Sequence, residues 1–425
     1  MTKNKNIWIL QTGEPLHIDQ DDLRPMRGMN LADKLSEKGN NVTLISSLFN
    51  HQKKIHRSHK YVGKKTHINE NLALILLDSP GYKKNISIRR IYDHLIMSYN
   101  LRKFLSGEKK QPDIVFIGYP PIEVAFVMYR WLKKRNIPYI LDVKDQWPHL
   151  IVSAFSRKLQ FIIKFLIFPY FYFARKIFSN ANAITSMSNS FIDWGRNFSE
   201  TKRNSLDRVL PLVPKIKPEN IFLKEEAKRR CNKLNIYKDK QINILFIGSI
   251  SSAFNFDTII SCASELPNNV RFVICGDGEL RKSLIEKSKL FENIVFPGWV
   301  DDSMMRVLSK RSSYAIAPYK NIKNFKDNIP NKIIDYLSLG LPIFFSLDGE
   351  VENLNFKYNF GIKYIENSKK SLLEKISLII RDENLEGKLS KNALNLYNKH
   401  YTYDLVYDDA VDLINKTYDS QEIKK

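Results

Sequence analysis

Two carboxylates eight residues apart, Asp327 and Asp335, enclose the segment DNIPNKIID, which carries the clearest chemical pattern in this sequence. Pro330 suits the first position of a helix, where its missing N–H costs nothing. The N–H groups of Asn331 and Lys332 would then have no partner within the helix and would point outward at the positive end of the helix dipole. Such a helix start, with the charge of Lys332 beside it, is a site for a phosphate or diphosphate.

The spacing of the two carboxylates allows them to flank that anion. Asp327 falls just outside the expected helix, and Asp335 lies about one and a half turns inside it. Gly340 and Pro342 end the helix, and residues 343–345 are expected to form the next strand. An ordinary surface helix with an aspartate in its middle is the alternative interpretation.

The elements that must position these residues follow the pattern of a doubly wound α/β protein, in which short apolar runs alternate with helical patterns. In the first half, we predict a helix at residues 23–38 and strands at 6–10, 42–46, 72–77, 114–117, 139–143 and 183–186. In the second half, we predict strands at residues 243–247, 270–274, 294–296, 314–317 and 343–345. Because ligands of such sheets bind at the carboxyl ends of the strands, the candidate residues should gather there.

The length of 425 residues suits two such domains, each with its own core. We expect an N-terminal domain at residues 1–211, a linker region at 212–241, where strong apolar runs are few, and a second domain at 242–400. Residues 401–425 are expected to form a helix that packs back on the first domain.

The segment DNIPNKIIDYLSLGLP resembles the E-x7-E motif of retaining glycosyltransferases, in which two acidic residues precede a Gly-x-Pro turn into a strand. Those enzymes belong to glycosyltransferase family 4 and have the GT-B fold, with two Rossmann-like domains that face each other across a cleft. The Pro-Asn-Lys-x-x-acid-Tyr version is similar to the subgroup that builds bacterial surface polysaccharides such as O-antigen and capsule. This chain has Asp at both Glu positions of the motif.

Three glycine-containing turns in the second half, in INILFIGSISS, VICGDGEL and NIVFPGWVD, resemble the donor-binding turns of that family in their order along the chain. The residues that the resemblance assigns to donor binding are Gly248, Ser249, Ile250, Gly276, Asp277, Gly298, Asn331, Lys332 and Asp335. Many family members also carry an arginine and a lysine in or just after the first turn, but residues 248–260 contain neither. Either Lys332 and the helix start do more, or Arg281 or Lys282 reaches the diphosphate.

Two loops of the first half also resemble the family. ILDVKDQWP resembles its R/K-D-x-W-P segment on the acceptor side and places Lys144 and Asp145 at a strand end. QTGEPLHIDQDDLRPMRG resembles its first loop, where Glu14, Arg24 and Arg27 lie where an acceptor phosphate could approach. These residues and Lys144 are the acceptor candidates, and a local ion pair between Lys144 and Asp145 is the alternative.

The resemblance implies a mechanism. Breaking a glycosyl–diphosphate bond leaves negative charge on the diphosphate, which Lys332 and the helix start can stabilise without a metal ion. By resemblance, Asp335 holds the ribose hydroxyls and Asp327 the hydroxyls of the sugar. Asp145 has the chemistry to orient or deprotonate an acceptor hydroxyl. The catalytic candidates are therefore Asp145, Asp327 and Lys332.

The expected reaction transfers a hexosyl or N-acetylhexosaminyl group from a nucleotide sugar, a UDP-sugar, with retention of anomeric configuration. The expected acceptor is a polyprenyl-diphosphate-linked glycan, so the protein is expected in the cytoplasm, bound peripherally to the inner face of the cell membrane. No cofactor or metal is expected. The alternatives are a nucleotide-sugar epimerase of the same fold and a basic nucleic-acid-binding protein.

The net charge of +22 fits attraction to an anionic membrane and to lipid-linked phosphate. Such a charge also suits nucleic-acid binding. However, the sequence shows no RNP-like, zinc-finger or basic-zipper pattern, so nucleic acid is not expected as a partner. An abundance of lysine from AT-rich codons is the third explanation.

Metal-binding patterns are weak in this sequence. The three cysteines form no C-x-x-C pair, and the eight histidines show no H-E-x-x-H spacing. The odd number of cysteines implies no disulfide framework, which indicates a reducing cytosol. Asp19-Gln20-Asp21 matches the D-x-D metal-binding motif of the other large glycosyltransferase fold. In that fold the motif follows a strand within the nucleotide-binding domain, whereas here it lies in the first loop before a helix, so we interpret the match as a coincidence. The basic stretch from His51 to His59 is interpreted as a solvated loop.

Residues 149–178 are apolar, rich in aromatic side chains and punctuated by Arg and Lys. The longest uncharged run is too short to cross a bilayer, for which about 20 apolar residues are needed. The composition suits a bilayer interface, where long cations reach the headgroups. A pair of buried amphipathic helices on the first domain is the alternative.

Overall fold

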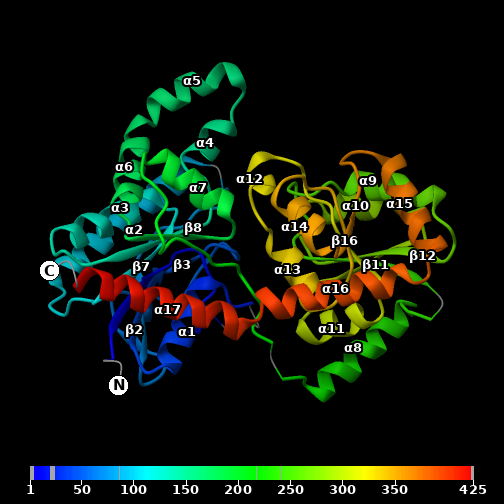
Figure 1. Ribbon diagram of the computed structural model, residues 1–425, viewed down its shortest axis with the longest axis horizontal. Coiled ribbons are helices and arrows are strands. Elements are labelled where there is room, and N and C mark those ends of the chain that lie inside the picture. The colour runs from blue at the N-terminus through cyan, green and yellow to red at the C-terminus, as the bar shows by residue number, and fades with distance from the viewer. Residues whose placement is uncertain (1–3, 20–23, 86, 217, 240, 423–425) are drawn as a thin grey trace. The chain divides into compact units, whose positions relative to one another are not determined.

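The computed structural model describes residues 4–19, 24–85, 87–216, 218–239 and 241–422. The chain divides into two compact units (Figure 1). Unit 1 comprises residues 1–212 and 404–425, and unit 2 comprises residues 213–403. The sequence suggested a linker region at residues 212–241, and all of these residues except Leu212 belong to unit 2.

Unit 1 is built on a sheet with the strand order β10-β9-β8-β7-β1-β2-β6-β5, which is parallel except for β5. A short β3–β4 hairpin lies outside this sheet. The strands are β1 (Asn6–Leu10), β2 (Asn41–Ser47), β3 (Phe49–Asn50), β4 (Ile55–His56), β5 (Thr66–His67), β6 (Leu72–Leu77), β7 (Ile114–Tyr119), β8 (Tyr139–Val143), β9 (Ala183–Ser186) and β10 (Arg208–Val209). Strands β6, β7 and β8 are buried throughout and largely apolar, with Asp142 of β8 as a charged exception, because helices cover both faces of a parallel sheet.

The helices of unit 1 supply those covering layers. They are α1 (Arg27–Glu37), α2 (Ile88–Gly107), α3 (Ile122–Lys133), α4 (His149–Ser153), α5 (Arg157–Leu166), α6 (Phe168–Ser179), α7 (Asn189–Phe198) and α17 (Tyr403–Glu422), with a 3-10 turn at His59–Tyr61. On one face, α2 packs on α3 and α3 packs on α6. The stack of Trp8 on Trp131, with ring centroids 5.5 Å apart, joins β1 to α3 in the core.

Helix α17 follows unit 2 in the chain but belongs to unit 1, where Figure 1 shows it in red beside α1. Lys34 of α1 holds its start through Asp404 at 2.6 Å and Asp408 at 3.3 Å. The hydroxyl of Tyr407 accepts a hydrogen bond from buried Asn30 at 3.1 Å. The apolar face of α17 is buried, as its 3.6-residue periodicity requires.

Unit 2 contains a second parallel sheet with the order β13-β12-β11-β14-β15-β16. Its strands are β11 (Ile242–Ile247), β12 (Val270–Cys275), β13 (Ile294–Gly298), β14 (Tyr314–Ala317), β15 (Ile343–Phe345) and β16 (Gly361–Lys363). Its helices are α8 (Ile221–Lys233), α9 (Phe256–Cys262), α10 (Arg281–Lys287), α11 (Asp302–Lys310), α12 (Lys323–Lys326), α13 (Asn331–Ser338), α14 (Glu350–Tyr358), α15 (Lys369–Arg381) and α16 (Leu385–His400), with a 3-10 turn at Ala263–Glu265. The prediction of two Rossmann-like units with C-terminal helices is confirmed.

The helix predicted at residues 23–38 is shorter than expected, and its first residue, Leu23, lies outside the described residues. Helix α1 begins only at Arg27, and Met26 before it is extended. Pro25 accounts for the late start, because a proline disfavours helical backbone in the residue before it. The short strands β3, β4, β5, β10 and β16 were not predicted, since two or three residues carry no periodic pattern.

The packing of α17 generates a stability prediction. Leu413 is 2% exposed, whereas Leu405 of the same helix is 49% exposed. Leu413→Ala should lower the free energy of unfolding of unit 1 by about 2–5 kcal/mol, because it removes buried methyl groups and leaves a cavity. Leu405→Ala should change it by less than about 0.5 kcal/mol. Denaturant unfolding of the full chain measures both, and equal effects would contradict the docking of α17 on unit 1.

Candidate functional site

The centre of the sheet in unit 2 is a topological switch point. The chain leaves β11 toward β12 on one side of the sheet and returns to β14 on the other side. Ligands of open α/β sheets bind in the crevice outside the carboxyl ends of the strands at such a point. The turns after β11, β12 and β13 and the start of α13 lie at these ends.

The three glycine turns form one hydrogen-bonded layer. The Gly276 N–H donates to the Gly298 carbonyl at 2.7 Å, and the Ile250 N–H donates to the Asp277 carbonyl at 2.8 Å. A Cβ added to Gly276 would stand 1.8 Å from the Gly248 carbonyl oxygen. The backbones of neighbouring turns therefore approach each other at distances that a side chain would prevent.

Lys332 lies directly against the first of these turns. Its Nζ donates to the Ile247 carbonyl at 2.6 Å and stands 4.9 Å from the centre of the Phe246 ring. A Cβ added to Gly248 would lie 1.5 Å from this nitrogen, and Gly248 has a φ of 145°. Glycine at this position therefore leaves the space in which the ammonium group sits at the carboxyl end of β11.

Helix α13 is fixed to the end of β11 by two side chains one turn apart. While Lys332 bonds the Ile247 carbonyl, the hydroxyl of Tyr336 accepts the Ile247 N–H at 2.9 Å. Burial raises the pKa of Tyr336 well above its usual value, so this hydroxyl stays neutral. Both polar backbone groups of Ile247 are thus satisfied from one face of α13.

The start of α13 differs from the prediction by one position, because Pro330 is the N-cap and Asn331 is the first helical residue. Pro330 has a ψ of 147°, and its carbonyl accepts the Ile333 N–H at 2.9 Å. The side-chain Oδ1 of Asn331 is buried and has no hydrogen-bond partner among the described residues. A buried acceptor of this kind suits a ligand that brings a hydroxyl or N–H.

The two carboxylates lie on either side of this helix start along the chain. Asp327 is the C-cap of α12, and Lys323 donates to it at 2.9 Å. Asp335 is half-buried within α13. Ser249 is exposed and Ile250 is buried, so the first turn presents its polar residue to solvent.

A further cation near the glycine turns comes from α8, within the region suggested as a linker. Arg230 donates to the carbonyls of Pro297 at 2.6 Å and Trp299 at 3.1 Å. Arg281 also lies near this turn, since its Nη2 would stand 3.7 Å from a Cβ built on Gly298. The sequence pattern suggested Arg281 but gave no signal for Arg230.

In unit 1, Glu14 organises the loop after β1. This carboxylate is 4% exposed, accepts the Gly28 N–H at 2.8 Å and pairs with Lys144 at the end of β8. The alternative expected for Lys144 was a local ion pair with Asp145, but the pair that the structure shows is with Glu14. Glu14 and Lys144 therefore join the two loops that were predicted to bind the acceptor.

Arg27 is buried beneath these loops. Its guanidinium lies 3.3 Å from Asp142 and donates to the Leu210 carbonyl at 2.9 Å. Asp142 is fully buried and also accepts from Gln11 and Thr185, each at 3.1 Å. This placement favours a supporting role for Arg27 over the predicted contact with an acceptor phosphate. No pattern in the sequence indicated that Asp142 and Gln11 belong to the same cluster.

The acceptor candidate Arg24, in the loop before α1, and the catalytic candidate Asp145, after β8, are both half-buried. In the part of the chain that the structure describes, no group of three or more His, Cys, Asp or Glu side chains could hold a metal ion. Asp19 of the formal D-x-D pattern pairs with Arg57 at 2.7 Å, and Asp21 lies outside the described residues.

The aromatic segment at residues 149–178 divides into an exposed and a partly buried helix. None of the described residues of α5 is buried, whereas α6 buries Phe171, Ala174, Ile177 and Phe178. Figure 1 shows α5 standing away from the sheet of unit 1. Across the described residues, no helix is long and apolar enough to cross a membrane.

Residues 228–396, nearly all of unit 2 from α8 to α16, match the family model described as glycosyl transferases group 1. Unit 2 is therefore similar to this family over those residues. This match confirms, at the level of the domain, the glycosyltransferase that the motifs predicted, and it includes Arg230, the glycine turns and α13.

Three known proteins resemble this chain. One is the GalNAc-α-(1→4)-GalNAc-α-(1→3)-diNAcBac-PP-undecaprenol α-1,4-N-acetyl-D-galactosaminyltransferase of Campylobacter jejuni, 28% identical over 170 residues, or 36% of this chain and 43% of that protein. Sucrose-phosphate synthase from Thermosynechococcus elongatus is 13% identical, with a TM-score of 0.71 over 98% of this chain and 100% of that one. HepE of Anabaena in complex with UDP is 11% identical, with a TM-score of 0.62 over 97% and 100%. The two solved structures show the shared fold.

The close approach at Gly248 generates a prediction for the stability of unit 2. Gly248→Ala should destabilise unit 2 by about 1–3 kcal/mol, because the new methyl group displaces Lys332 and the backbone conformation strains any L side chain. Gly387→Ala is the matched control, since a Cβ there meets nothing within 4 Å and the residue lies in α16. The control should be neutral or slightly stabilising. Thermal unfolding of both variants decides, and a stable Gly248→Ala protein would contradict the geometry at Lys332.

Proposed function

We propose that this protein is a retaining glycosyltransferase of family 4. It transfers a hexosyl or N-acetylhexosaminyl group from a UDP-sugar to a polyprenyl-diphosphate-linked glycan. The reaction takes place at the inner face of the cytoplasmic membrane, in the biosynthesis of a surface polysaccharide such as O-antigen or capsule.

The observation that carries this proposal is the position of Lys332. An ammonium group at the start of a helix, bonded to the last carbonyl of the central strand and facing Gly248, which has no side chain, suits an anion at the switch point. The match of this unit to glycosyl transferases group 1 supports a nucleotide-sugar diphosphate as that anion. The HepE complex supports UDP, and the Campylobacter relative supports an undecaprenol-PP-linked acceptor.

The proposed mechanism separates two charges. As the bond between the sugar and the diphosphate breaks, Lys332 and the N–H groups at the start of α13 stabilise the departing diphosphate. Asp335 holds the ribose hydroxyls, and Asp327 holds those of the transferred sugar. Asp145 orients the acceptor hydroxyl or accepts its proton. Because Lys332 supplies the charge that a metal ion supplies elsewhere, the proposed reaction needs no metal.

Replacement of Lys332 tests the donor site. Lys332→Ala should weaken the binding of UDP by about tenfold or more, because a charge-assisted hydrogen bond contributes about 1.5–3 kcal/mol. It should lower transfer from a UDP-sugar by a factor on the order of 10²–10³. Calorimetry with UDP and single-turnover transfer measure the two effects.

Lys287→Ala is the matched control, because this lysine lies on the exposed side of α10 and pairs with Asp257. It should bind UDP as the unchanged protein does. If the unchanged protein binds no UDP, and no UDP-hexose or UDP-N-acetylhexosamine raises its melting temperature, the proposed donor is wrong.

The membrane part of the proposal rests on α5. Phe161 is 81% exposed and Phe165 is 76% exposed, and Arg157, Lys158 and Lys164 lie on the same helix, which has no acidic residue. Exposed aromatic rings beside cations suit the interface of an anionic bilayer. Residue Phe171 is not available for this role, because it is buried against the core of unit 1.

In the double variant Phe161→Ser, Phe165→Ser, the affinity for vesicles of phosphatidylglycerol and phosphatidylcholine should fall by a factor of about ten or more. The reason is that each ring buried in the bilayer interface contributes about 1.5–3 kcal/mol to binding. Phe222→Ser, Phe356→Ser is the control, because these rings are also exposed but lie on α8 and α14. Higher salt should weaken the binding of the unchanged protein. Vesicle flotation measures all three, and equal binding by the two double variants would exclude α5 as the anchor.

A further inference from the structure

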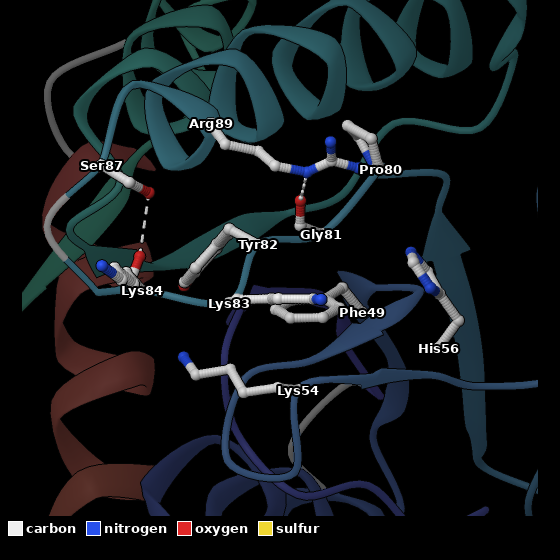
Figure 2. Close-up of a pocket in the computed structure, with 10 residues that line it drawn as sticks. All are labelled: Phe49, Lys54, His56, Pro80, Gly81, Tyr82, Lys83, Lys84, Ser87 and Arg89. Atoms are coloured by element: carbon white, nitrogen blue, oxygen red, sulfur yellow. Dashed lines mark hydrogen bonds between the residues drawn. The ribbon is translucent and has the colours of Figure 1, made fainter.

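Unit 1 contains a cavity of about 580 Å³ that no candidate motif explains. Figure 2 shows it between the β3–β4 hairpin and the loop that leads into α2. The residues that line it are Phe49, Lys54, His56, Pro80, Gly81, Tyr82, Lys83, Lys84, Ser87 and Arg89. The sequence suggested that the basic stretch at residues 51–59 was a solvated loop, but Lys54 and His56 of this stretch line the cavity.

The charge of the lining has one sign. Lys54, Lys83, Lys84 and Arg89 are cationic, and no aspartate or glutamate is among the lining residues. The nearby carboxylate of Asp93 is buried and accepts the Gly81 N–H at 2.7 Å. The cavity is therefore suited to an anion with more than one negative oxygen.

Lys54 is the most enclosed of these cations. Its Nζ donates to the Asn85 side chain at 2.6 Å and stands 4.5 Å from the centre of the Tyr82 ring. Burial and the neighbouring Arg90 guanidinium lower the pKa of Lys54 to about 8. A bound anion would relieve this crowding of positive charge.

The walls of the cavity are aromatic and closely packed. The Phe49 and Tyr82 ring centres are 5.0 Å apart, and the Tyr82 hydroxyl lies 2.6 Å from Nδ1 of His51. A Cβ added to Gly81, which has a φ of 70°, would lie 2.5 Å from the Phe49 ring. These contacts hold the loop before α2 against the β3–β4 hairpin and keep the cations in place.

An exposed apolar stripe begins at the rim of the cavity. Ile88 lies between the lining residues Ser87 and Arg89 and is 85% exposed. Tyr92, Leu95 and Tyr99 follow it at helical spacing along α2, and all three are at least half exposed. Their positions place an apolar surface directly after a cationic cavity.

We propose that this cavity binds the phosphate or diphosphate headgroup of a lipid-linked acceptor, and that the first part of the lipid chain lies along the α2 stripe. This proposal rests on the proposed function and names the part of unit 1 that recognises its acceptor. A free phosphate would use the cations but would leave the stripe without a ligand. The apolar stripe therefore favours a lipid source for the anion.

Two pairs of adjacent lysines provide a matched test of the headgroup. Lys83 and Lys84 line the cavity, whereas Lys64 and Lys65 are exposed elsewhere in unit 1 and do not line it. The double variants Lys83→Ser, Lys84→Ser and Lys64→Ser, Lys65→Ser change the net charge equally. Calorimetry with monomeric farnesyl diphosphate should show about tenfold weaker binding for the first variant and unchanged binding for the second. Equal binding by the two variants would overturn the proposal.

The stripe is tested with a third variant and a second probe. Leu95→Ser, Tyr99→Ser should weaken the binding of farnesyl diphosphate but not that of inorganic pyrophosphate. Farnesyl diphosphate should also bind the unchanged protein more tightly than pyrophosphate. If the two probes bind equally and the stripe variant binds both as the unchanged protein does, the cavity takes a soluble phosphate and the lipid part of the proposal is wrong.

Binding of UDP separates this inference from the proposed function. UDP should bind all three double variants as it binds the unchanged protein, because the donor residues lie in unit 2. If UDP binds normally but the cavity variants bind farnesyl diphosphate as tightly as the unchanged protein does, only the proposed acceptor site is wrong. Loss of UDP binding in the unchanged protein would instead count against the proposed donor.

Discussion

The candidate donor site depends on the bonding of one residue, Ile247, at the end of the central strand of unit 2. Its carbonyl accepts from Lys332 and its N–H is accepted by Tyr336. Since both partners come from one face of α13, the helix is held in a fixed rotation relative to β11. The absence of a side chain at Gly248 then decides how close the ammonium group comes to the strand end. The requirement for glycine at position 248 thus determines where the positive charge of Lys332 lies.

In unit 1, the residues beneath the candidate loops are held together by a buried carboxylate. Asp142 lies at zero exposure beneath the loops of the unit, where Arg27, Gln11 and Thr185 satisfy its oxygens. A buried charge is tolerated only when it is paired and hydrogen-bonded, so each of these partners is constrained by the others. Glu14 and Lys144 are not part of this cluster, and their ion pair joins the loops after β1 and β8.

The sequence predicted the elements that local patterns determine. Strands at Leu72–Leu77, Tyr139–Val143 and Tyr314–Ala317 have the predicted bounds, because apolar runs that end in turns leave little choice of register. The glycine turns were also found, since glycine is required where backbones approach closely. The position of α13 between Asp327 and the Gly-x-Pro turn followed from proline and glycine alone.

The missed features depend on contacts between residues far apart in the chain. Arg27 in a loop looks like a ligand contact until its partner Asp142 is known, and Lys144 looks like the partner of Asp145 until Glu14 is found beside it. For the aromatic segment, the two interpretations each describe one helix: α5 is exposed and α6 is partly buried. Periodicity could not separate them, because both helices carry aromatic rings and cations.

The return of α17 to unit 1 has a consequence for how the chain folds as it is made. Unit 1 consists of two segments, and all of unit 2 lies between them in the chain. During translation, the ribosome must therefore release all of unit 2 before α1 can meet Asp404, Tyr407 and Asp408. Until then the nascent first unit exposes the apolar surface that α17 later covers. Termination of translation between unit 2 and α17 should consequently damage unit 1, although most of unit 1 is synthesised before unit 2.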